Sequence, residues 1–324
     1  TSLVGSEMCI RDSSHMVDYI LKYAIRPDQK VYCIKRWMED TKNLDHINHD
    51  SFEYIDCDLL DGMSVKRAVE ISKPEKVFHF AAQSFPEVSF KIPVITLQTN
   101  IIGTTHLLES IKESEYDPTI VSVSSSEVYG NPNEDEVPIT EENPIRPANP
   151  YSISKVGHDL MSQYYHKAYG MKIITTRMFS HEGARRGKQF ALSSFAYQIV
   201  QNEKLIKNDC QIRHGNLDSV RTYNHIEDAI KAYWLCSESR RYGEVYNIGG
   251  DYTCTVGEAL DMLISKSKIS DALTKLLDKK RVRPTDITLQ IPSSDKFREH
   301  FGWKPEKDLT HICDDLLNYW REVL

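Results

Sequence analysis

The feature that most restricts the fold of this chain is a regular alternation of short apolar segments with longer amphipathic ones. The short segments, which predict β-strands, cover residues 30–36, 52–56, 76–80, 119–125 and 172–179. The longer segments, which predict helices, begin at His15 and then cover residues 65–71, 94–114 and 150–170. This alternation is typical of parallel strands joined by crossover helices. We therefore expect an α/β fold whose ligands bind beyond the carboxyl ends of the strands.

The alternation loosens after Phe179, which indicates a second unit. In this half Asn224 and Glu227 form a capping-box pattern, which predicts the start of a helix. We expect a Rossmann-like, doubly wound parallel sheet over residues 15–179, joined by part of 220–250, and a smaller C-terminal α/β substrate domain over 180–324.

Residues 1–14, TSLVGSEMCIRDSS, fit this plan poorly. A nucleotide-binding sheet opens with an apolar strand and a glycine-rich turn before its first helix. Here only Gly5 is present, the segment is not a convincing strand, and it lacks the basic region and apolar core of a signal peptide. We interpret the segment as foreign sequence, such as a cloning or sequencing-adapter translation, fused to a truncated domain. The alternative is a divergent N-terminus.

The composition narrows the class of partner. There are 40 basic and 47 acidic side chains, a formal charge of −7, whereas nucleic-acid binding favours a positive balance. No apolar run approaches the roughly 20 residues that cross a bilayer. The seven cysteines include no CxxC pair, which argues against a zinc site and fits reduced thiols in a cytoplasm. We expect a cytoplasmic protein without a metal, nucleic-acid or membrane partner.

Tyr151 and Lys155 are the strongest chemical signal. They form a YxxxK pair on a predicted helix, where residues four apart share a face. A lysine charge beside a tyrosine hydroxyl stabilises the deprotonated form of that hydroxyl. The deprotonated form can take a proton from a sugar hydroxyl while hydride leaves the same carbon. An exposed surface pair is the alternative interpretation of this motif alone.

Three predicted strand ends carry small or acidic residues that suit the same site. SSSEVYG, residues 124–130, offers hydroxyl partners for Tyr151. AAQS, residues 81–84, would let a cofactor ribose approach the backbone, and in CDLLD, residues 57–61, Asp58 can accept from an adenine amino group. The three strand ends together with the YxxxK pair are far more specific than any one of them.

On these residues the chain from His15 to Leu324 resembles the extended short-chain dehydrogenase/reductases. Within them it is similar to the GDP-mannose 4,6-dehydratases and the related GDP-6-deoxy-4-keto-mannose reductases. The motifs that carry the resemblance are DCDLLD, AAQSFPEVSF, SSSEVYG, NPYSISK, ARRGKQF, GNLDSVR and RPTDI. The resemblance implies a bound nicotinamide dinucleotide, a sugar nucleotide such as GDP-mannose as substrate, and a homodimer or homotetramer.

The resemblance also implies catalytic roles. Ser125 stands where these enzymes carry the Thr or Ser that contacts the sugar O4. Ser126 and Glu127 occupy the dehydratase pair, in which the Glu is the base at C5 and helps to expel the C6 hydroxyl. Tyr151 and Lys155 are the catalytic pair. A solvated loop acid, or a structural acid shared with reductases, is the alternative interpretation of Glu127.

The binding residues that the resemblance implies fall into two sets. The cofactor set comprises Asp58, Leu59, Ala81, Ala82 and Gln83, together with Tyr151 and Lys155. The substrate set comprises Ser84, Ser180, Arg185, Arg221 and Arg283. Arginine suits a diphosphate because its planar fork makes bidentate bonds. A subunit contact is the alternative place for the three arginines.

The choice of cofactor can be read at the end of the strand over 30–36. Folds that prefer NAD place an acid at this strand end for the ribose 2′-hydroxyl. This chain has Lys35 and Arg36 instead, two cations that favour a 2′-phosphate. We therefore expect NADP. A solvated basic strand end, with NAD as the cofactor, is the alternative.

Three functions are compatible with these residues. The first is GDP-mannose 4,6-dehydratase chemistry, which is redox-neutral and keeps NADP bound. The second is the reductase, which would use the same Tyr151 and Lys155 to reduce a C4 ketone and would consume NADPH. The third is a sugar-nucleotide-binding chain that is inactive because it lacks the glycine-rich turn, which would place a helix N-terminus against the pyrophosphate.

Overall fold

The computed structural model describes residues 1–5, 10–205, 210–282 and 285–324. The chain divides into two compact units. The first comprises Thr1–Gly130, Pro144–Met178 and Ile230–Asn247, and the second comprises Asn131–Asn143, Phe179–Ala229 and Ile248–Leu324. The candidate catalytic residues all belong to the first unit.

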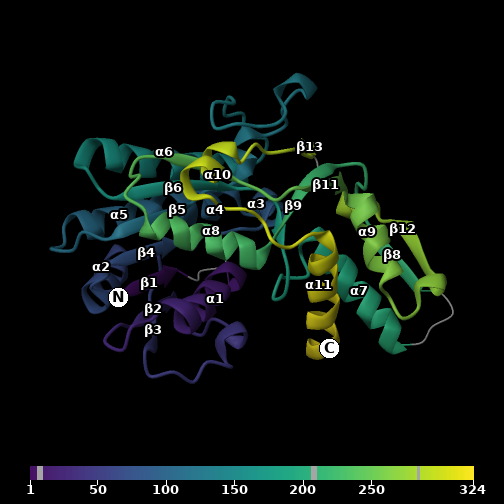
Figure 1. The fold of residues 1–324 in the computed structure, drawn as a ribbon, viewed down its shortest axis with the longest axis horizontal. Coiled ribbons are helices and arrows are strands. Elements are labelled where there is room, and N and C mark those ends of the chain that lie inside the picture. The colour runs from purple at the N-terminus through teal and green to yellow at the C-terminus, as the bar shows by residue number, and fades with distance from the viewer. Residues whose placement is uncertain (6–9, 206–209, 283–284) are drawn as a thin grey trace. The chain divides into compact units, whose positions relative to one another are not determined.

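The first unit is built on a seven-stranded sheet (Figure 1). In spatial order its strands are β10 (Val245–Ile248), β6 (Ile173–Met178), β5 (Thr119–Val123), β4 (Lys76–His79), β1 (Ser2–Gly5), β2 (Val31–Lys35) and β3 (Phe52–Asp56). Neighbouring strands from β6 to β3 pair in parallel. This topology confirms the doubly wound α/β fold that the sequence predicts.

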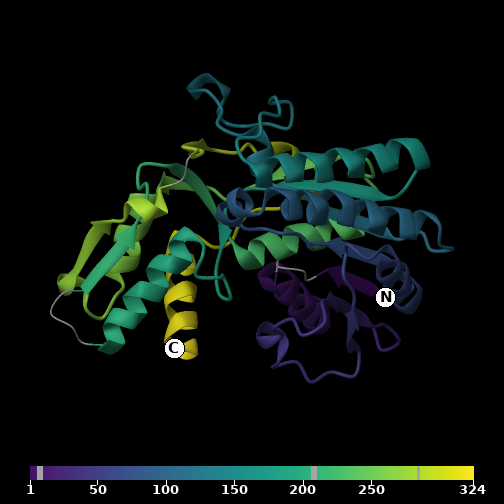
Figure 2. The same cartoon turned by 180° about the vertical axis from the view of Figure 1, so that it is seen from behind.

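Helices cover both faces of this sheet. On one face lie α2 (Gly62–Ser72), α5 (Gly103–Lys112) and α6 (Pro150–Tyr169), and on the other lie α1 (Ile10–Tyr19) and α8 (Ile226–Glu238), as Figures 1 and 2 show. Tyr19 of α1 packs on Trp234 of α8, with ring centroids 5.9 Å apart. Gly157 lets α6 pack closely on η3 (Gln98–Ile102), because a Cβ there would lie 2.5 Å from Cδ1 of Ile101. This packing fixes α6, which carries the YxxxK pair.

The N-terminal segment differs from the prediction. Residues Ser2–Gly5 form β1, a central strand paired with β2 on one side and β4 on the other, although the sequence pattern argued against a strand. The helix that follows begins at Ile10 rather than at His15 and continues as a π-helical turn over Ile20–Ala24. Pairing along both edges supplies the backbone hydrogen bonds that make a short, weakly patterned segment a strand. The foreign origin of residues 1–14 stays a prediction.

The second unit has smaller sheets and its own core. β9 (Val220–His225) pairs with β11 (Tyr252–Thr255), β13 (Leu289–Gln290) and β7 (His181–Glu182), while β8 (Cys210–His214) pairs with β12 (Leu273–Leu277). Its helices are α7 (Ala191–Leu205), α9 (Val256–Ser265), α10 (Asp295–Phe301) and α11 (Leu309–Val323). The apolar faces of α7, α9 and α11 meet in one buried cluster that includes Phe195, Leu260 and Leu316.

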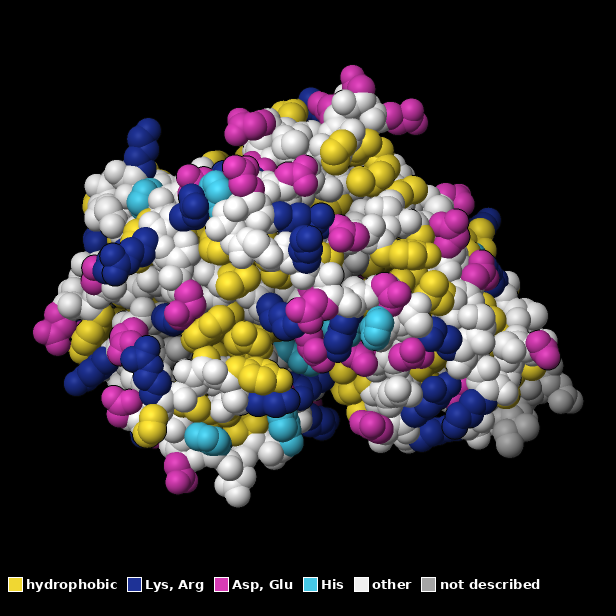
Figure 3. Space-filling model, in the orientation of Figure 1, with side chains coloured by type: hydrophobic (Ala, Val, Ile, Leu, Met, Phe, Trp, Pro, Cys, Tyr) yellow, Lys and Arg dark blue, Asp and Glu magenta, His cyan; other side chains and the backbone are white. Residues whose placement is uncertain are grey.

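Charged side chains of both signs lie on the surface (Figure 3). Figure 3 shows basic and acidic side chains interspersed over one face of the molecule. No helix among the residues that the structure describes is both long enough and apolar enough to cross a membrane.

Candidate active site

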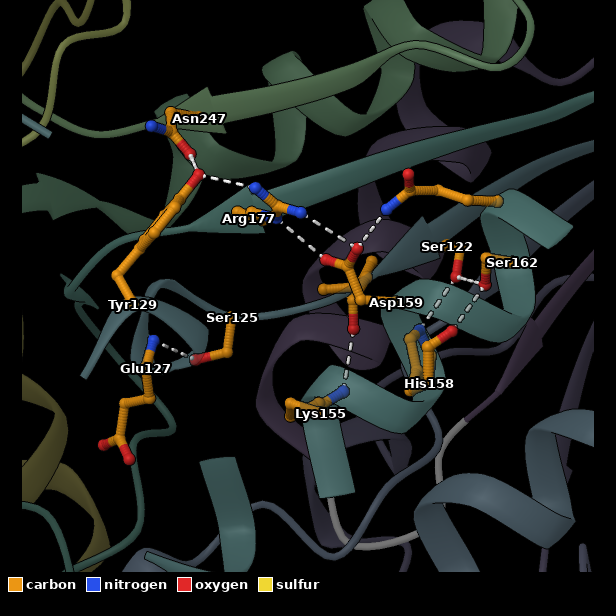
Figure 4. A network of polar contacts seen from close by, with 12 residues as sticks. Ser122, Ser125, Glu127, Tyr129, Lys155, His158, Asp159, Ser162, Arg177 and Asn247 are labelled. Atoms are coloured by element: carbon orange, nitrogen blue, oxygen red, sulfur yellow. Dashed lines mark hydrogen bonds and ion pairs between the residues drawn. The ribbon is translucent and has the colours of Figure 1, made fainter. Parts of the chain in front are cut away.

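The loop after β5 presents Ser125, Ser126 and Glu127, the residues expected to act on the sugar. It continues as a 3₁₀ turn over Ser126–Tyr129, which Ser125 caps by accepting a hydrogen bond from the backbone N–H of Glu127 at 3.2 Å. Figure 4 shows this bond, with the Glu127 carboxylate directed away from Ser125. Ser126 is buried, whereas Ser125 and Glu127 are partly exposed. The loop therefore offers a hydroxyl and a carboxylate at the carboxyl end of a strand.

Helix α6 positions Tyr151 and Lys155 one turn apart. The helix starts at Pro150, and Asn149 caps it through a capping box with Ser152. Tyr151 and Lys155 are 8% and 3% exposed, which excludes the alternative of a solvated surface pair. The Lys155 ammonium donates to the carbonyl oxygen of Val123, the last residue of β5, at 2.7 Å. The structure thus brings the YxxxK pair to the strand end that carries Glu127.

A buried ion pair, which the sequence did not reveal, anchors the same helix and loop. The Arg177 guanidinium on β6 binds Asp159 of α6, with Nε to Oδ2 at 2.9 Å and Nη2 to Oδ1 at 3.1 Å. Arg177 Nη1 also donates to the Tyr129 hydroxyl at 2.8 Å, and that hydroxyl donates to Asn247 at 2.8 Å (Figure 4). Asp159 lies four residues after Lys155, so helical periodicity was the available signal.

Two buried histidines lie near Lys155, and the sequence did not reveal them either. Thr104 bridges them, with its hydroxyl 2.8 Å from His79 Nε2 and 2.9 Å from His158 Nδ1, and their rings stack with centroids 5.0 Å apart. His158 Nε2 also bonds Ser122 at 2.8 Å. Burial, and secondly the Lys155 charge, lowers the pKa of His79 to about 3 and holds the pKa of His158 well below its usual value. Both rings are therefore neutral, which spares Lys155 two nearby positive charges.

The cofactor candidates divide into a buried group and a pocket-lining group. Leu59, Ala81, Ala82 and Gln83 are almost completely buried. A pocket of about 500 Å³ at the ends of β2 and β3 is lined by Arg36, Trp37, Met38, Glu39, Asp56, Cys57, Asp58, Asp61 and Ser64. One Asp58 oxygen already accepts from the backbone N–H of Leu60 at 2.8 Å. The pocket has the size and concavity of a small-ligand site.

The two cations expected at a 2′-phosphate both have carboxylate partners. Lys35 pairs with Asp56 at 2.6 Å. Arg36 lines the pocket and lies 3.9 Å from Glu39, whose other oxygen accepts from the Arg36 backbone N–H at 3.0 Å. The Arg36 side chain is 46% exposed, so its long ion pair is weak. Arg36 is thus better placed than Lys35 to meet an added phosphate.

The substrate candidates are divided between the two units. Ser84 lies in the first unit, and Ser180, Arg185 and Arg221 lie in the second. The Arg221 guanidinium donates hydrogen bonds to the carbonyl oxygen of Val220, at 2.9 Å, and to that of Ile287. Arg185 has a left-handed backbone, with φ of 65°, a conformation that non-glycine residues adopt rarely. Arg283 lies outside the described residues.

One group of possible metal ligands lies in the second unit. The ligand atoms of His225, Glu227 and Asp315 are all within 4.8 Å of one another. His225 Nδ1 accepts from the Glu227 backbone N–H at 3.2 Å, so the neutral ring carries its hydrogen on Nε2, directed at Asp315 2.8 Å away. Glu227 pairs with Lys307 at 2.8 Å. A metal on Nε2 would need that hydrogen removed, so the group is better explained as a hydrogen bond from His225 to Asp315 beside an ion pair between Glu227 and Lys307.

The chain is similar to known enzymes that act on sugar nucleotides. The GDP-mannose 4,6 dehydratase family matches residues 12–316. The chain is 25% identical to a GDP-mannose 4,6-dehydratase of Yersinia enterocolitica, over 92% of its own length and 89% of the relative. It is 27% identical to a GDP-6-deoxy-D-mannose reductase of Pseudomonas aeruginosa, over 76% and 80%. The solved structure of RMD from Pseudomonas aeruginosa with NADPH shares the fold, with a TM-score of 0.82 at 23% identity over 100% and 99% of the two chains.

Proposed function

The chain belongs to the GDP-mannose 4,6 dehydratase family, and from that premise we propose that it removes water from GDP-mannose to give the 4-keto-6-deoxy sugar nucleotide. The observation that carries the proposal is the placement of Glu127 on the loop whose strand end binds Lys155. A reductase that delivers hydride to a C4 ketone has no need of a base at C5, whereas a 4,6-dehydratase does.

In the proposed reaction Tyr151 and Glu127 transfer protons, and the other catalytic residues assist them. Tyr151 takes the proton of O4 as C4 is oxidised, and the buried Lys155 ammonium stabilises the resulting tyrosinate. The C4 ketone acidifies C5, whose proton passes to Glu127. Glu127 then passes this proton to the C6 hydroxyl, which leaves as water with Ser125 or Ser126 assisting, while Ser125 also contacts O4. A nicotinamide dinucleotide, when bound, supplies the acceptor and later the donor of hydride, so the net change is loss of one water.

The first unit has features that fit such a cofactor. The buried Ala81 and Ala82 after β4 leave room for close approach of a ribose, and the pocket of about 500 Å³ suits the adenosine end. Residues 6–9, where such folds place the turn that meets the pyrophosphate, lie outside the described residues. We take NADP as the preferred cofactor because Arg36 lines that pocket. The homodimer or homotetramer and the cytoplasmic location stay predictions.

The second candidate is the reductase. The Pseudomonas aeruginosa relative is named a GDP-6-deoxy-D-mannose reductase, and its identity to the chain, 27%, is close to that of the dehydratase relative, 25%. The two functions differ in their electron balance, because only the reductase consumes NADPH.

The decisive experiment is to incubate the protein with GDP-mannose and a trace of NADP, with NAD in a parallel reaction. The mass of the sugar nucleotide is then measured by mass spectrometry. We expect the loss of one water per sugar without net cofactor consumption, and faster turnover with NADP. Tyr151→Phe should lower turnover by about 10²- to 10⁴-fold, because it removes the acid–base group, while calorimetry shows GDP-mannose still bound. Tyr164→Phe, an exposed tyrosine on the same helix, is the matched control.

Other outcomes would support one of the alternative functions or contradict the role of Tyr151. NADPH oxidation with the 4-keto-6-deoxy sugar, but no change in GDP-mannose, would establish the reductase. Thermal stabilisation by GDP-mannose but not by either dinucleotide would establish a sugar-nucleotide-binding chain without cofactor. Full activity in Tyr151→Phe would remove its assigned role.

A further inference from the structure

Asn149 uses both ends of its side-chain amide, and the two ends serve different elements. Its Oδ1 accepts from the backbone N–H of Ser152 at 2.8 Å, which caps α6. Its Nδ2 donates to Oε2 of Glu127 at 2.9 Å. The side chain is held in place because Asn149 is 6% exposed and its own backbone N–H donates to the Ser152 hydroxyl at 2.9 Å.

The second bond is not needed for capping. Ser, Thr and Asp cap helices about as well as Asn, because capping uses only an acceptor oxygen. Among these residues only Asn adds an N–H donor to that acceptor in one rigid group. At Asn149 the donor is directed at the Glu127 carboxylate, so the amide has a task beyond starting the helix.

The geometry of Glu127 suits a base that is held at one oxygen. Its backbone N–H is fixed on Ser125, and its Oε2 is fixed on Asn149. Its Oε1 has no hydrogen-bond partner among the residues that the structure describes, which leaves one oxygen open to take a proton.

Asn149 also links the two proton-transfer groups. It precedes Tyr151 by two residues, and the Tyr151 backbone N–H is itself held by the Ser89 hydroxyl at 3.2 Å. A rigid first turn of α6 thus fixes the tyrosine that acts at O4 and, through one amide, the carboxylate that acts at C5. Alignment of this kind matters because small displacements of a catalytic group cost large factors in rate.

We infer that Asn149 is a positioning residue that holds the Glu127 carboxylate in one orientation for removal of the C5 proton. This inference rests on the proposed dehydratase function. It separates the two proton steps: loss of the Asn149 donor slows proton removal at C5 and leaves the oxidation at C4 intact.

The test compares Asn149→Ser and Asn149→Asp with the wild-type protein. Both variants keep a capping oxygen; the first loses the donor, and the second places a carboxylate beside Glu127. Turnover is measured with GDP-mannose deuterated at C4 or at C5. We expect kcat to fall on the order of 10- to 100-fold in Asn149→Ser, and further in Asn149→Asp. The C5 isotope effect should rise, the C4 effect should fall towards one, and KM and the thermal midpoint should stay unchanged.

The control is Asn133→Ser, the same change at an exposed asparagine that heads another capping box. It should alter neither isotope effect. Wild-type isotope effects in both Asn149 variants, with or without a lower kcat, would show a purely structural cap and overturn the inference. A wild-type protein that leaves GDP-mannose unchanged would overturn the proposed function, and this role with it, before any variant is compared.

Discussion

Asn100 and Asn224 are both fully buried, yet their amides have opposite surroundings. Asn100 lies on η3 in the first unit. Its Oδ1 accepts from the Gln83 backbone N–H at 2.7 Å, and its Nδ2 donates to the Gln83 carbonyl at 3.0 Å and to the Ser154 hydroxyl at 2.7 Å. Asn224 lies on β9 in the second unit, and neither its Oδ1 nor its Nδ2 has a hydrogen-bond partner among the described residues.

This difference separates a preorganised region from one with unused hydrogen-bonding capacity. Asn100 joins the loop after β4 to α6, so the cofactor candidate Gln83 and the helix that carries the YxxxK pair are held by one amide. The Asn224 amide is buried without a hydrogen bond from the described residues, which is unfavourable. Such a buried amide is typical of a place where an ordered water or a ligand makes the hydrogen bonds. Substitution should therefore have opposite effects at the two positions.

Asn100→Leu should produce the largest change. It leaves the buried N–H and C=O of Gln83, and the Ser154 hydroxyl, without the partner they had. At about 1–3 kcal/mol for each stranded group, we expect the free energy of unfolding to fall by about 3–5 kcal/mol. Urea denaturation followed by circular dichroism measures this. Asn318→Ala, on the exposed side of α11, is the control and should stay within about 0.5 kcal/mol of wild type. A loss at Asn100 no larger than that of the control would show that its three hydrogen bonds add nothing to stability.

The buried histidines give the second test of the closed network in the first unit. Their folded pKa values lie below the unfolded value, about 3 for His79 and lowered for His158, so the unfolded state binds more protons in acid. Their contribution to stability is therefore complete above about pH 7, and it is lost as the pH falls from the unfolded value of about 6.5 towards 3. Between pH 7 and pH 5 His79 alone should cost about 2 kcal/mol, because its folded pKa is about 3, and His158 adds to this loss.

His158→Gln removes one of these titrating groups. It should reduce the loss of stability between pH 7 and pH 5, as measured from urea unfolding curves at the two pH values. His49→Gln, at an exposed position, should leave the pH dependence as in the wild type. An unchanged pH dependence in His158→Gln would mean that the ring is not held neutral by burial.

The sequence was most informative where a pattern is local. The strand predicted over 52–56 is β3 (Phe52–Asp56), and the helix predicted over 150–170 is α6 (Pro150–Tyr169). The carboxyl ends of β4 and β5 carry the expected small and acidic residues, because a parallel sheet places such ends along one edge. The YxxxK spacing needed only helical periodicity to place Tyr151 and Lys155 on one turn.

Prediction from the sequence failed where a structure depends on residues that are far apart along the chain. β1 is a strand because β2 and β4 pair with it, and nothing within residues 1–14 reports those neighbours. His79 and His158 meet through Thr104 on a third element, so no local spacing marks them. Asn224 was interpreted as a helix cap with Glu227, and this is wrong: it lies in β9, where pairing with β7 overrides the local pattern, and α8 begins at Ile226.

Asn224→Leu should produce the smallest change, and in the opposite direction to Asn100→Leu. The leucine side chain has a similar shape and no polar atoms, so burying it avoids the penalty of an unpartnered amide. We expect the free energy of unfolding to rise by about 1 kcal/mol, measured from urea unfolding in the absence of ligand. A fall of that size would show instead that the amide binds an ordered water. The sign of this change therefore decides whether the second unit has unused hydrogen-bonding capacity at Asn224 or is as closed as the network around Asn100.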